Sequence, residues 1–392
     1  MRRTRRAGRS VVPLAILSLL AAVGVTLGAC NSGSSSPPAQ TPPGVSGSPV
    51  PTVDVSGIPS DVGRSDSAQF TGAGSTFAAP LYTRWFFDYQ HTVASGVRGN
   101  YQAIGSGGGI QNIMRKTIDF GATDAPMTDA EIAKSPGIQH IPMALGAVAI
   151  THNIDGVTQP LKLDGATLAK IYLGTITRWN DRAITAQNPG AHLPDAEIIV
   201  VHRSDGSGTS YAFTDYLSNI SSDWRARVGT SKNPQWPLGL GGQGNDGVTQ
   251  QVKQNRNSIG YVDLIFADKN HLPLVQLKNA AGAYITPTIA ATSAAAQGVT
   301  MPPDYRVSIV NSKTPGAYPI ATFTWILLYR NQTDASKGKA LVDFLWWAVH
   351  DGQKSAQQLD YAPLPGDVVH DVEQTLATQI THNGQALLRA GR

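Results

Sequence analysis

The sequence predicts an α/β protein of two lobes, and two observations lead to this fold class. A polar region occupies the N-terminal part of the 392-residue chain, and about 325 residues remain after it, a length that is long for one hydrophobic core and indicates two. Within those residues, apolar strand patterns end in loops rich in Gly and Ser and then enter helical patterns, as they do in α/β proteins.

Residues 1–29 have the composition of a secretory signal peptide. Five arginines precede an apolar run over residues 11–27 that is too short to span a membrane comfortably. The run ends in Leu27-Gly28-Ala29-Cys30, which resembles a bacterial lipobox. The resemblance implies cleavage before Cys30 and a lipid on its sulfur. The alternative is an ordinary signal peptide that is followed by an incidental cysteine.

Charge and cysteine content exclude several classes of function. The whole chain has a net charge of +4, and removing the five arginines of residues 1–29 leaves about −1, so the basic balance belongs to the export signal and gives no reason to expect nucleic-acid binding. Cys30 is the only cysteine. An internal disulfide and a cysteine-based metal site are therefore excluded, and we expect neither a metal nor a cofactor.

Residues 30–66 are rich in Ser, Pro, Gly and Thr and contain almost no large apolar side chain. Such a segment cannot bury a core and is predicted to be a disordered tether that follows the lipidated cysteine. A flexible chain of about 36 residues has an r.m.s. reach of roughly 30–35 Å. With a lipid at one end, it would hold a folded body close to a membrane.

Three junctions of one kind lie in the folded part. A short strand pattern at 69–71 enters residues 72–77 and a helix that starts near Pro80, a second strand at 100–104 meets the loop 105–109, and a third at 198–201 meets the loop 206–210. Each junction offers free backbone N–H groups, hydroxyl donors and the positive end of a helix dipole. Together they predict one convergent anion site, whereas the alternative is three ordinary helix starts far apart in space.

Two carboxylates stand where the anion would bind. A strand pattern at 119–123 is followed by Asp124 and by a capping box from Thr128 to Glu131, and Asp205 follows Arg203 by two residues. Bare carboxylates repel anions. They fit the site if Asp205 neutralises and orients Arg203, and if Asp124 accepts a hydrogen bond from a ligand that keeps a proton at pH 7, as phosphate does and sulfate does not. The alternative for each aspartate is helix capping.

These segments together resemble the phosphate-binding proteins of bacterial ABC transporters, the extracytoplasmic receptors often called PstS. The resemblance covers Gln69 to about Val372, and the segments that carry it are, in family order, GAGSTFAAPLY, YQAIGSGGGIQNI, DFGATDAPMT, IYLGTITRWND, RSDGSGTSYAFTDYL, WPLGLGGQGNDGV, IGYVD and LDYAPLP. It implies a two-lobed periplasmic-binding-protein fold of type II-like form, in which each lobe is a mixed sheet flanked by helices and the ligand lies in the cleft between the lobes. The chain would cross between lobes near Gly146 and Pro319, so that residues 67–145 and 320–392 form the first lobe and residues 146–319 the second.

The resemblance also implies a ligand set and partners. The implied phosphate ligands are Ser75, Thr76, Phe77, Ser106, Asp124, Arg203, Asp205, Ser207, Gly208 and Thr209. The implied role is capture of inorganic phosphate and its delivery to the membrane permease subunits of an ABC importer, by a monomer anchored through its lipid to the outer face of the cytoplasmic membrane.

Other functions fit the sequence less well. An exported phosphatase or other hydrolase would need a positioned base and a nucleophile elbow at Ser106 or Ser207, and residues 104 and 205 are Ile and Asp where the elbow requires Gly. The run from Gly239 to Gly244 matches the dinucleotide pattern, with Asp263 roughly 20 residues on, but no strand pattern precedes it. We interpret that run as a hinge or surface segment. A structural lipoprotein would not need the three junctions, and a receptor for another oxyanion would not need Asp124.

Overall fold

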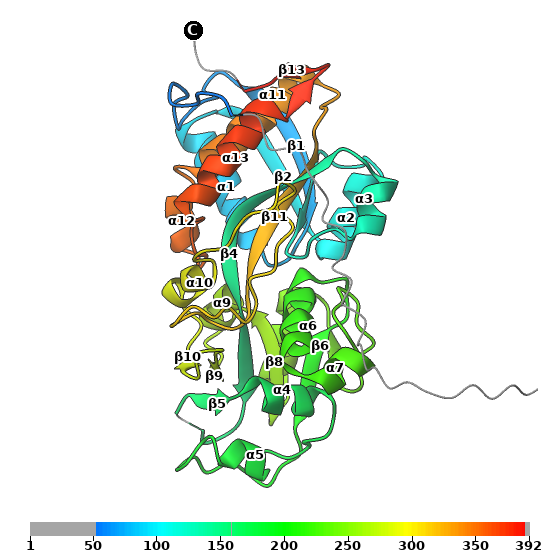
Figure 1. Ribbon diagram of the computed structural model, residues 1–392, viewed down its shortest axis with the longest axis vertical. Coiled ribbons are helices and arrows are strands. Elements are labelled where there is room, and N and C mark those ends of the chain that lie inside the picture. The colour runs from blue at the N-terminus through cyan, green and yellow to red at the C-terminus, as the bar shows by residue number, and fades with distance from the viewer. Residues whose placement is uncertain (1–51, 158, 389–392) are drawn as a thin grey trace, which may run out of the picture. The chain divides into compact units, whose positions relative to one another are not determined.

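The computed structural model describes residues 52–157 and 159–388, which all belong to one unit of the chain. The signal peptide, Cys30 and the first part of the predicted tether lie outside the described residues. A single mixed sheet of eight strands, in the order β2-β1-β3-β11-β4-β8-β6-β7, runs through the protein (Figure 1). Its strands are β1 (Ser67–Gly74), β2 (Gly96–Ala103), β3 (Phe120–Thr123), β4 (Ile138–Asn153), β6 (Ile199–Arg203), β7 (Leu240–Gly242), β8 (Ser258–Asp263) and β11 (Ala321–Tyr329).

Strand β4 joins the two halves of the sheet. Its first part pairs antiparallel with β11, and its second part, from Val148 to Asn153, pairs antiparallel with β8. The crossing that the sequence places near Gly146 falls inside this strand, because all sixteen residues from Ile138 onward form one strand. Fifteen of the sixteen residues are buried, as expected for a central strand that is covered on both faces.

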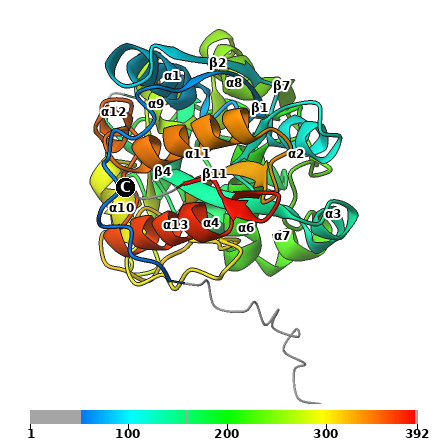
Figure 2. The same cartoon turned by 90° about the horizontal axis from the view of Figure 1, so that it is seen from above.

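Lobe 1 is built around the larger apolar cluster, which contains the aromatic side chains Phe70, Trp85, Phe120, Trp325 and Phe344. The predicted helical spacing after Pro80 is confirmed by α1 (Ala79–Thr92), which buries Leu81, Tyr82, Trp85, Phe86 and Tyr89 on one face. Figure 2 shows α11 (Ala335–Val349) and α13 (Gly366–Thr378) lying across this end of the protein. The remaining elements here are α2 (Ser106–Met114), α3 (Asp129–Lys134), α12 (Gln353–Gln357), and the paired strands β12 (Thr381–His382) and β13 (Gln385–Ala386).

Lobe 2 is built around a second apolar cluster, in which Tyr172, Trp179, Phe213, Trp224 and Tyr261 are buried. The face of Phe213 stacks on Tyr261, with ring centroids 4.4 Å apart. The elements of this lobe are α4 (Gly165–Tyr172), α5 (Arg182–Thr185), α6 (Gly208–Ile220), α7 (Ser222–Arg227), α8 (Gly244–Gln254), α9 (Leu264–Lys269), α10 (Ile289–Ala295), and a small sheet of β10 (Tyr284–Ile285), β9 (Val275–Lys278) and β5 (Leu161–Leu163).

The chain passes from one apolar cluster to the other at the centre of the sheet. Leu145 belongs to the first cluster and Ala147 to the second, and the chain returns from the second cluster at Ile320 to the first at Ala321. Residues such as Ala295, Tyr305 and Ala317 nevertheless pack in the first cluster, although the sequence assigns them to the second lobe. The exact division of the chain into lobes therefore stays a prediction.

Residues 52–66 pack against lobe 1, and the prediction that the disordered tether extends to residue 66 is wrong for this part. Val55, Ile58 and Val62 contact the first apolar cluster. The indole N–H of Trp346 donates to the carbonyl of Pro59 at 3.1 Å, and the backbone N–H of Val53 donates to Gln374 at 2.7 Å. A few scattered apolar residues are enough to dock an arm onto an existing core, which a composition argument about self-contained folding does not reveal.

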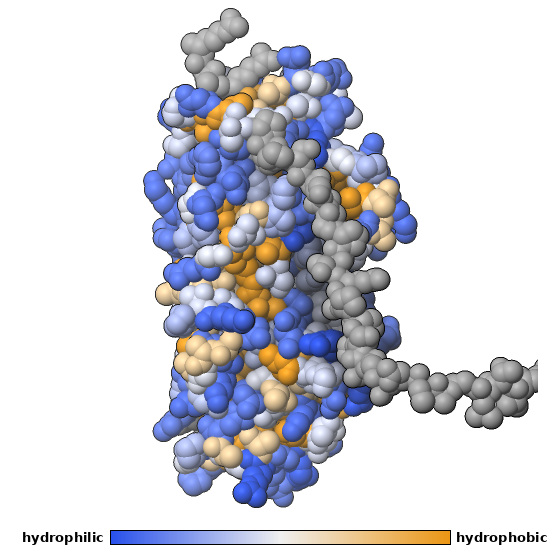
Figure 3. Space-filling view, in the orientation of Figure 1, coloured by the Kyte–Doolittle hydropathy of each residue, from blue (hydrophilic) through white to orange (hydrophobic). Residues whose placement is uncertain are grey.

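None of the helices formed by the described residues is long and apolar enough to cross a bilayer. On the face drawn in Figure 3, hydrophobic side chains gather in separate patches between hydrophilic ones rather than in one continuous band.

Candidate anion-binding site

The three Gly- and Ser-rich junctions meet where the two lobes face each other. Strands β1, β2 and β3 are parallel, so their carboxyl ends and the loops that follow lie at one edge of the sheet. The backbone N–H of Gly107 donates to the carbonyl of Gly206 across the lobes at 2.8 Å. A Cβ atom on Gly208 would lie 2.7 Å from the Cβ of Asp124 and from the Oγ of Ser106. Glycine at 208 is therefore what lets the start of α6 approach lobe 1 so closely.

Asp124 is the central residue of the part of the site that lobe 1 contributes. It is 1% exposed, and its carboxylate accepts hydrogen bonds from the hydroxyls of Ser75 (2.6 Å), Thr324 (2.8 Å) and Ser106 (3.2 Å). Burial raises the pKa of Asp124 to about 6, although the hydroxyls of Ser75 and Thr324 and the charge of Arg203 oppose this change. The predicted helix-capping alternative does not describe this residue, because Thr128 caps α3 and the predicted capping box with Glu131 is confirmed.

Arg203 supplies the positive charge on the lobe 2 side. Its guanidinium binds the carboxylate of Asp205 in a bidentate manner, with Nε to Oδ1 at 2.8 Å and Nη2 to Oδ2 at 2.6 Å. Arg203 is 2% exposed. Burial alone would raise the pKa of Asp205, but the hydrogen bonds and charge of Arg203 outweigh it and hold that pKa below its ordinary value. Asp205 is thus ionised and orients the guanidinium, as the sequence predicts.

Three hydroxyl groups of the predicted set have their lone pairs engaged by protein donors. Thr76 Oγ1 accepts from Asn245 Nδ2 at 3.0 Å, Ser207 Oγ accepts from the backbone N–H of Ser210 at 3.0 Å, and Thr209 Oγ1 accepts from Arg203 Nη1 at 3.3 Å. A hydroxyl has one hydrogen and two lone pairs. Hydroxyls that already accept from protein donors are suited to give their hydrogen to an anion.

Backbone N–H groups complete the donor set. Gly208 and Thr209 are the first residues of α6, and Ser207 is its N-cap, so these N–H groups have no acceptor inside the helix and carry the positive end of its dipole. On the lobe 1 side, the hydroxyl of Tyr361 donates to the carbonyl of Phe77 and that of Tyr101 to the carbonyl of Ser75 at 2.7 Å. These tyrosines fix the loop that presents the N–H of Phe77.

Ser75 differs from the other predicted ligands. Its hydroxyl accepts from the backbone N–H of Ala78 at 3.1 Å and directs its single hydrogen at Asp124. Its contacts are therefore those of a residue that supports Asp124. Ser106 makes longer contacts with the same residue, because its hydroxyl lies 3.2 Å from both the carboxylate and the backbone N–H of Asp124, compared with 2.6 Å for Ser75.

Sequence reasoning missed two contributors. Thr324 lies inside the apolar strand β11 next to a register shift between Thr324 and Trp325, and irregularities of this kind often re-aim a side chain beside a site. Asn245 follows the run from Gly239 to Gly244, most of which is exposed, as the prediction of a surface segment there requires, but the run also contributes to the site. That run contains β7, which pairs with β6, and ends at α8, where the backbone N–H of Gly244 donates to Asp205 at 2.9 Å.

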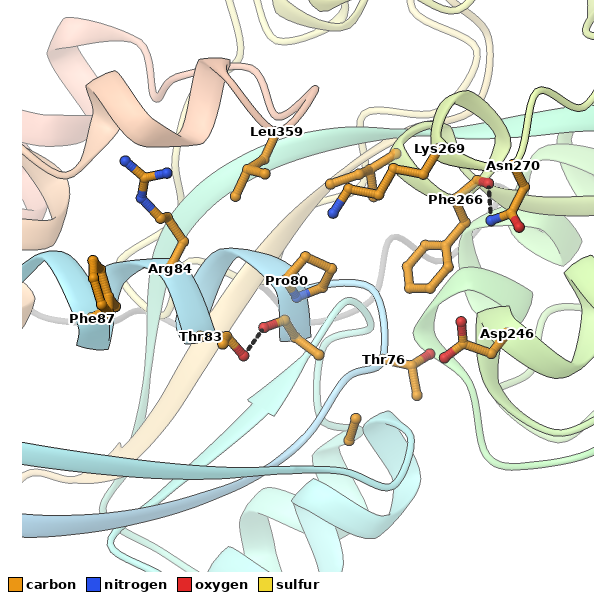
Figure 4. Close-up of a pocket in the computed structure, with 13 residues that line it drawn as sticks. Thr76, Pro80, Thr83, Arg84, Phe87, Asp246, Phe266, Lys269, Asn270 and Leu359 are labelled. Carbon is orange, nitrogen blue, oxygen red and sulfur yellow. Dashed lines mark hydrogen bonds between the residues drawn. The ribbon is translucent and has the colours of Figure 1, made fainter.

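A groove opens beside the site, between α1 and α9 (Figure 4). Its volume is about 620 Å³, and Thr76 and Asp246 lie on its floor from opposite lobes. Arg84, Phe87, Phe266 and Lys269 also line it. Within residues 52–157 and 159–388, no three or more His, Cys, Asp or Glu side chains cluster in a way that could hold a metal ion.

Comparison with known proteins identifies the class of this fold. The family model of the PBP superfamily domain matches residues 59–349. The fold, α/β with a mixed sheet shared by two lobes and a polar site between them, is a periplasmic-binding-protein fold, as predicted. A solved phosphate-binding protein from Stenotrophomonas maltophilia shares it with a TM-score of 0.64 at 17% identity, over 81% of this chain and 97% of that one.

Sequence relatives identify the family within this fold class. The phosphate-binding protein PstS of Xylella fastidiosa (strain Temecula1) is 42% identical over 82% of this chain and 88% of its own length. PstS of Pasteurella multocida is 40% identical over 79% of this chain and 90% of its own length. The chain belongs to the PstS family of phosphate-binding proteins.

Proposed function

We propose that this protein is the extracytoplasmic receptor that captures inorganic phosphate for an ABC importer and delivers it to the membrane permease subunits. One observation carries the proposal. A buried acceptor, Asp124, and a buried cation, Arg203, lie close enough for the charge of Arg203 to lower the pKa of Asp124, among hydroxyl donors and the backbone donors of a helix start. Relatives at 40% and 42% identity are named for phosphate binding.

The proposed ligands are Thr76, Phe77, Ser106, Asp124, Arg203, Ser207, Gly208 and Thr209, with Asp205 and Ser75 supporting Arg203 and Asp124. Neutral donors and one guanidinium surround a dianion with little bulk counter-charge. Asp124 accepts the proton that phosphate retains. A ligand without that proton would face the carboxylate as a like charge in a dry site, and a few kcal/mol of repulsion excludes sulfate by ~100-fold or more.

The receptor acts without catalysis in this proposal. Relatives are named as binding proteins, and the hydroxyls of Ser106 and Ser207 contact Asp124 and a backbone N–H, with no histidine base among their described partners. Lipidation at Cys30, attachment to the outer face of the cytoplasmic membrane and a monomeric state belong to the same proposal. They rest on the sequence of residues 27–30 and on the family.

The experiment is a calorimetric titration of the mature body with phosphate and with sulfate at pH 7, after unfolding and refolding to remove bound ligand. We expect tight phosphate binding with no measurable response to sulfate. Equal binding of both anions would contradict the acceptor role of Asp124. Binding of neither would contradict the receptor function itself.

A further inference from the structure

Three buried side chains beside the candidate site form a chain of hydrogen bonds from lobe 2 to lobe 1. Asn245 Nδ2 donates to Thr76 Oγ1 at 3.0 Å and to Asp263 Oδ2 at 2.7 Å, and the backbone N–H of Asp263 donates to Asn245 Oδ1 at 3.2 Å. Asn245 is 0% exposed and Asp263 is 1% exposed. Thr76 follows β1 in lobe 1, whereas Asn245 and Asp263 lie on α8 and at the end of β8 in lobe 2.

The contact with a backbone N–H fixes which way the Asn245 amide points. Oxygen and nitrogen of an asparagine can be exchanged by a half-turn of the amide, and the hydrogen-bond network decides between the two orientations. A backbone N–H can only donate, so the N–H of Asp263 must face the amide oxygen. The NH₂ group is then directed at Thr76 and at the Asp263 carboxylate.

This orientation decides what the Thr76 hydroxyl can do. Its oxygen receives the amide of Asn245 at 3.0 Å and is also approached by the backbone N–H of Asn245 at 3.4 Å. With its two lone pairs engaged, the hydroxyl can only donate its one hydrogen. Thr76 also lines the groove beside the site, where Figure 4 shows its side chain next to that of Asp246 from lobe 2.

We propose that Asn245 and Asp263 are positioning residues, which hold the Thr76 hydroxyl as a hydrogen-bond donor to phosphate across the lobe interface. The inference rests on the proposed phosphate-binding function. Asn245 acts on Thr76, and Asp263 acts on Asn245 by accepting the second amide hydrogen. Burial, and then the charge of Asp124, raises the pKa of Asp263 well above its ordinary value, which limits the negative charge that lobe 2 turns toward the anion.

These hydrogen bonds among Thr76, Asn245 and Asp263 also couple anion binding to the contact between the lobes. The Thr76–Asn245 bond exists only when the loop after β1 and the start of α8 are together. A phosphate that accepts from Thr76 therefore favours the arrangement in which Asn245 supports it.

The test is a double-mutant cycle read by calorimetric phosphate affinity at pH 7. We expect Asn245→Ala to weaken phosphate binding at least 10-fold and Thr76→Val to weaken it at least as much. In the Thr76→Val background, Asn245→Ala should add less than a twofold loss. The control is Asn255→Ala at the far end of α8, where the amide contacts only its own helix, and it should change the affinity by less than twofold.

Asp263 is tested by rescue. Asp263→Asn keeps an oxygen that accepts from Asn245 and should stay within threefold of the wild-type affinity, whereas Asp263→Leu should lose about as much as Asn245→Ala. If an alanine or leucine variant does not fold, Asn245→Asp is the second test, because its carboxylate oxygen would take the hydrogen of Thr76. We expect that variant to lose at least 10-fold as well.

The outcomes separate the inference from the proposed function. If the wild-type protein does not bind phosphate, the proposed function fails and the inference fails with it. If the wild-type protein binds, but Asn245→Ala has no effect or an equal effect with and without the Thr76 hydroxyl, the positioning role is wrong and the receptor function stands.

Discussion

The candidate site is built around an acceptor in lobe 1 and around a cation in lobe 2. In lobe 1, Asp124 collects three hydroxyl hydrogen bonds and has a pKa raised by burial to about 6. In lobe 2, Arg203 is neutralised by a bidentate contact with Asp205, whose pKa lies below its ordinary value. The two aspartates are only about 80 residues apart in sequence, yet their environments give them opposite protonation tendencies.

This difference assigns separate tasks to the two lobes. A buried acceptor can discriminate between anions by the proton they carry, but it cannot attract an anion by itself. A buried guanidinium beside a helix start attracts any oxyanion, but it does not distinguish among them. We therefore expect Asp124 in lobe 1 to determine selectivity and Arg203 in lobe 2 to supply the largest single share of the affinity, with both acting on a ligand only when the lobes are together.

Replacement of Arg203 is the largest disturbance that we predict. Arg203→Met removes the buried cation and leaves Asp205 facing the anion without its partner, and loss of one member of such a pair costs about 4 kcal/mol, or roughly 1000-fold in affinity. Calorimetric titration with phosphate measures the effect. The matched control is Arg256→Met, since the Arg256 side chain is 78% exposed and pairs with Asp155 at the surface. An Arg203→Met protein that binds within 10-fold of wild type would show that Arg203 does not supply the largest share of the affinity.

The raised pKa of Asp124 predicts that the free energy of unfolding of the ligand-free protein depends on pH. Between the ordinary value of 3.8 and the native value of about 6, the native state binds more protons at this group than the unfolded state does, so its contribution to the free energy of unfolding falls as the pH rises through that window. The pKa difference of about two units corresponds to about 3 kcal/mol. Asp124→Asn should therefore gain stability relative to wild type, by up to about 3 kcal/mol, between pH 4 and pH 7.

Denaturant unfolding at a series of pH values measures this gain. The matched control is Asp223→Asn at an exposed position, and the gain of Asp124→Asn should exceed any change in this variant. A difference between Asp124→Asn and wild type that stays constant from pH 4 to pH 7 would show that burial does not perturb Asp124.

The smallest predicted effect concerns an ion pair that ties the lobes together. Lys232 Nζ lies 2.7 Å from Glu131 Oε2 on α3, and the carbonyl of Lys232 accepts from the backbone N–H of Ser207. Lys232→Met removes this pair between the lobes, and a partly exposed pair of this kind is worth about 1 kcal/mol or less. We expect phosphate binding to weaken about two- to fivefold, with the loss shrinking at high salt. The exposed Lys170→Met is the control. An equal loss of affinity in both variants would contradict a specific role of the Lys232–Glu131 pair in phosphate binding.

Local patterns predicted the parts of the site that lie at strand ends. The strand-to-helix junctions at residues 72–77, 105–109 and 206–210 each have their own signature of Gly and hydroxyl residues, and so does the pair Arg203 and Asp205. The parallel order of β1, β2 and β3 places the first two junctions at one edge of the sheet. The third junction follows β6, which runs in the opposite direction and reaches the site from lobe 2. Asp124 was recognisable because a carboxylate at an anion site is unexpected.

Contributors without a local signature could not be predicted. Thr324 is one hydroxyl in an otherwise apolar strand, and only the pairing of β11 with β3 and β4 brings it to Asp124. Asn245 is hidden in a Gly-rich run, and its role depends on Asp263 eighteen residues later. Residues 52–66 have too few apolar side chains to fold alone, and their docking depends on surfaces of α11 and α13 that form far away in sequence.

The most direct test of the division between the lobes is the phosphate-to-sulfate affinity ratio of Asp124→Asn, measured by calorimetry at pH 7 beside wild type. An amide in place of the carboxylate no longer repels a fully ionised anion, while Arg203 and the start of α6 stay in place. We predict that the ratio falls from ~100 or more in wild type to less than ~10 in the variant, because sulfate binding appears. A variant that still rejects sulfate as strongly as wild type would contradict the claim that Asp124 in lobe 1 determines selectivity.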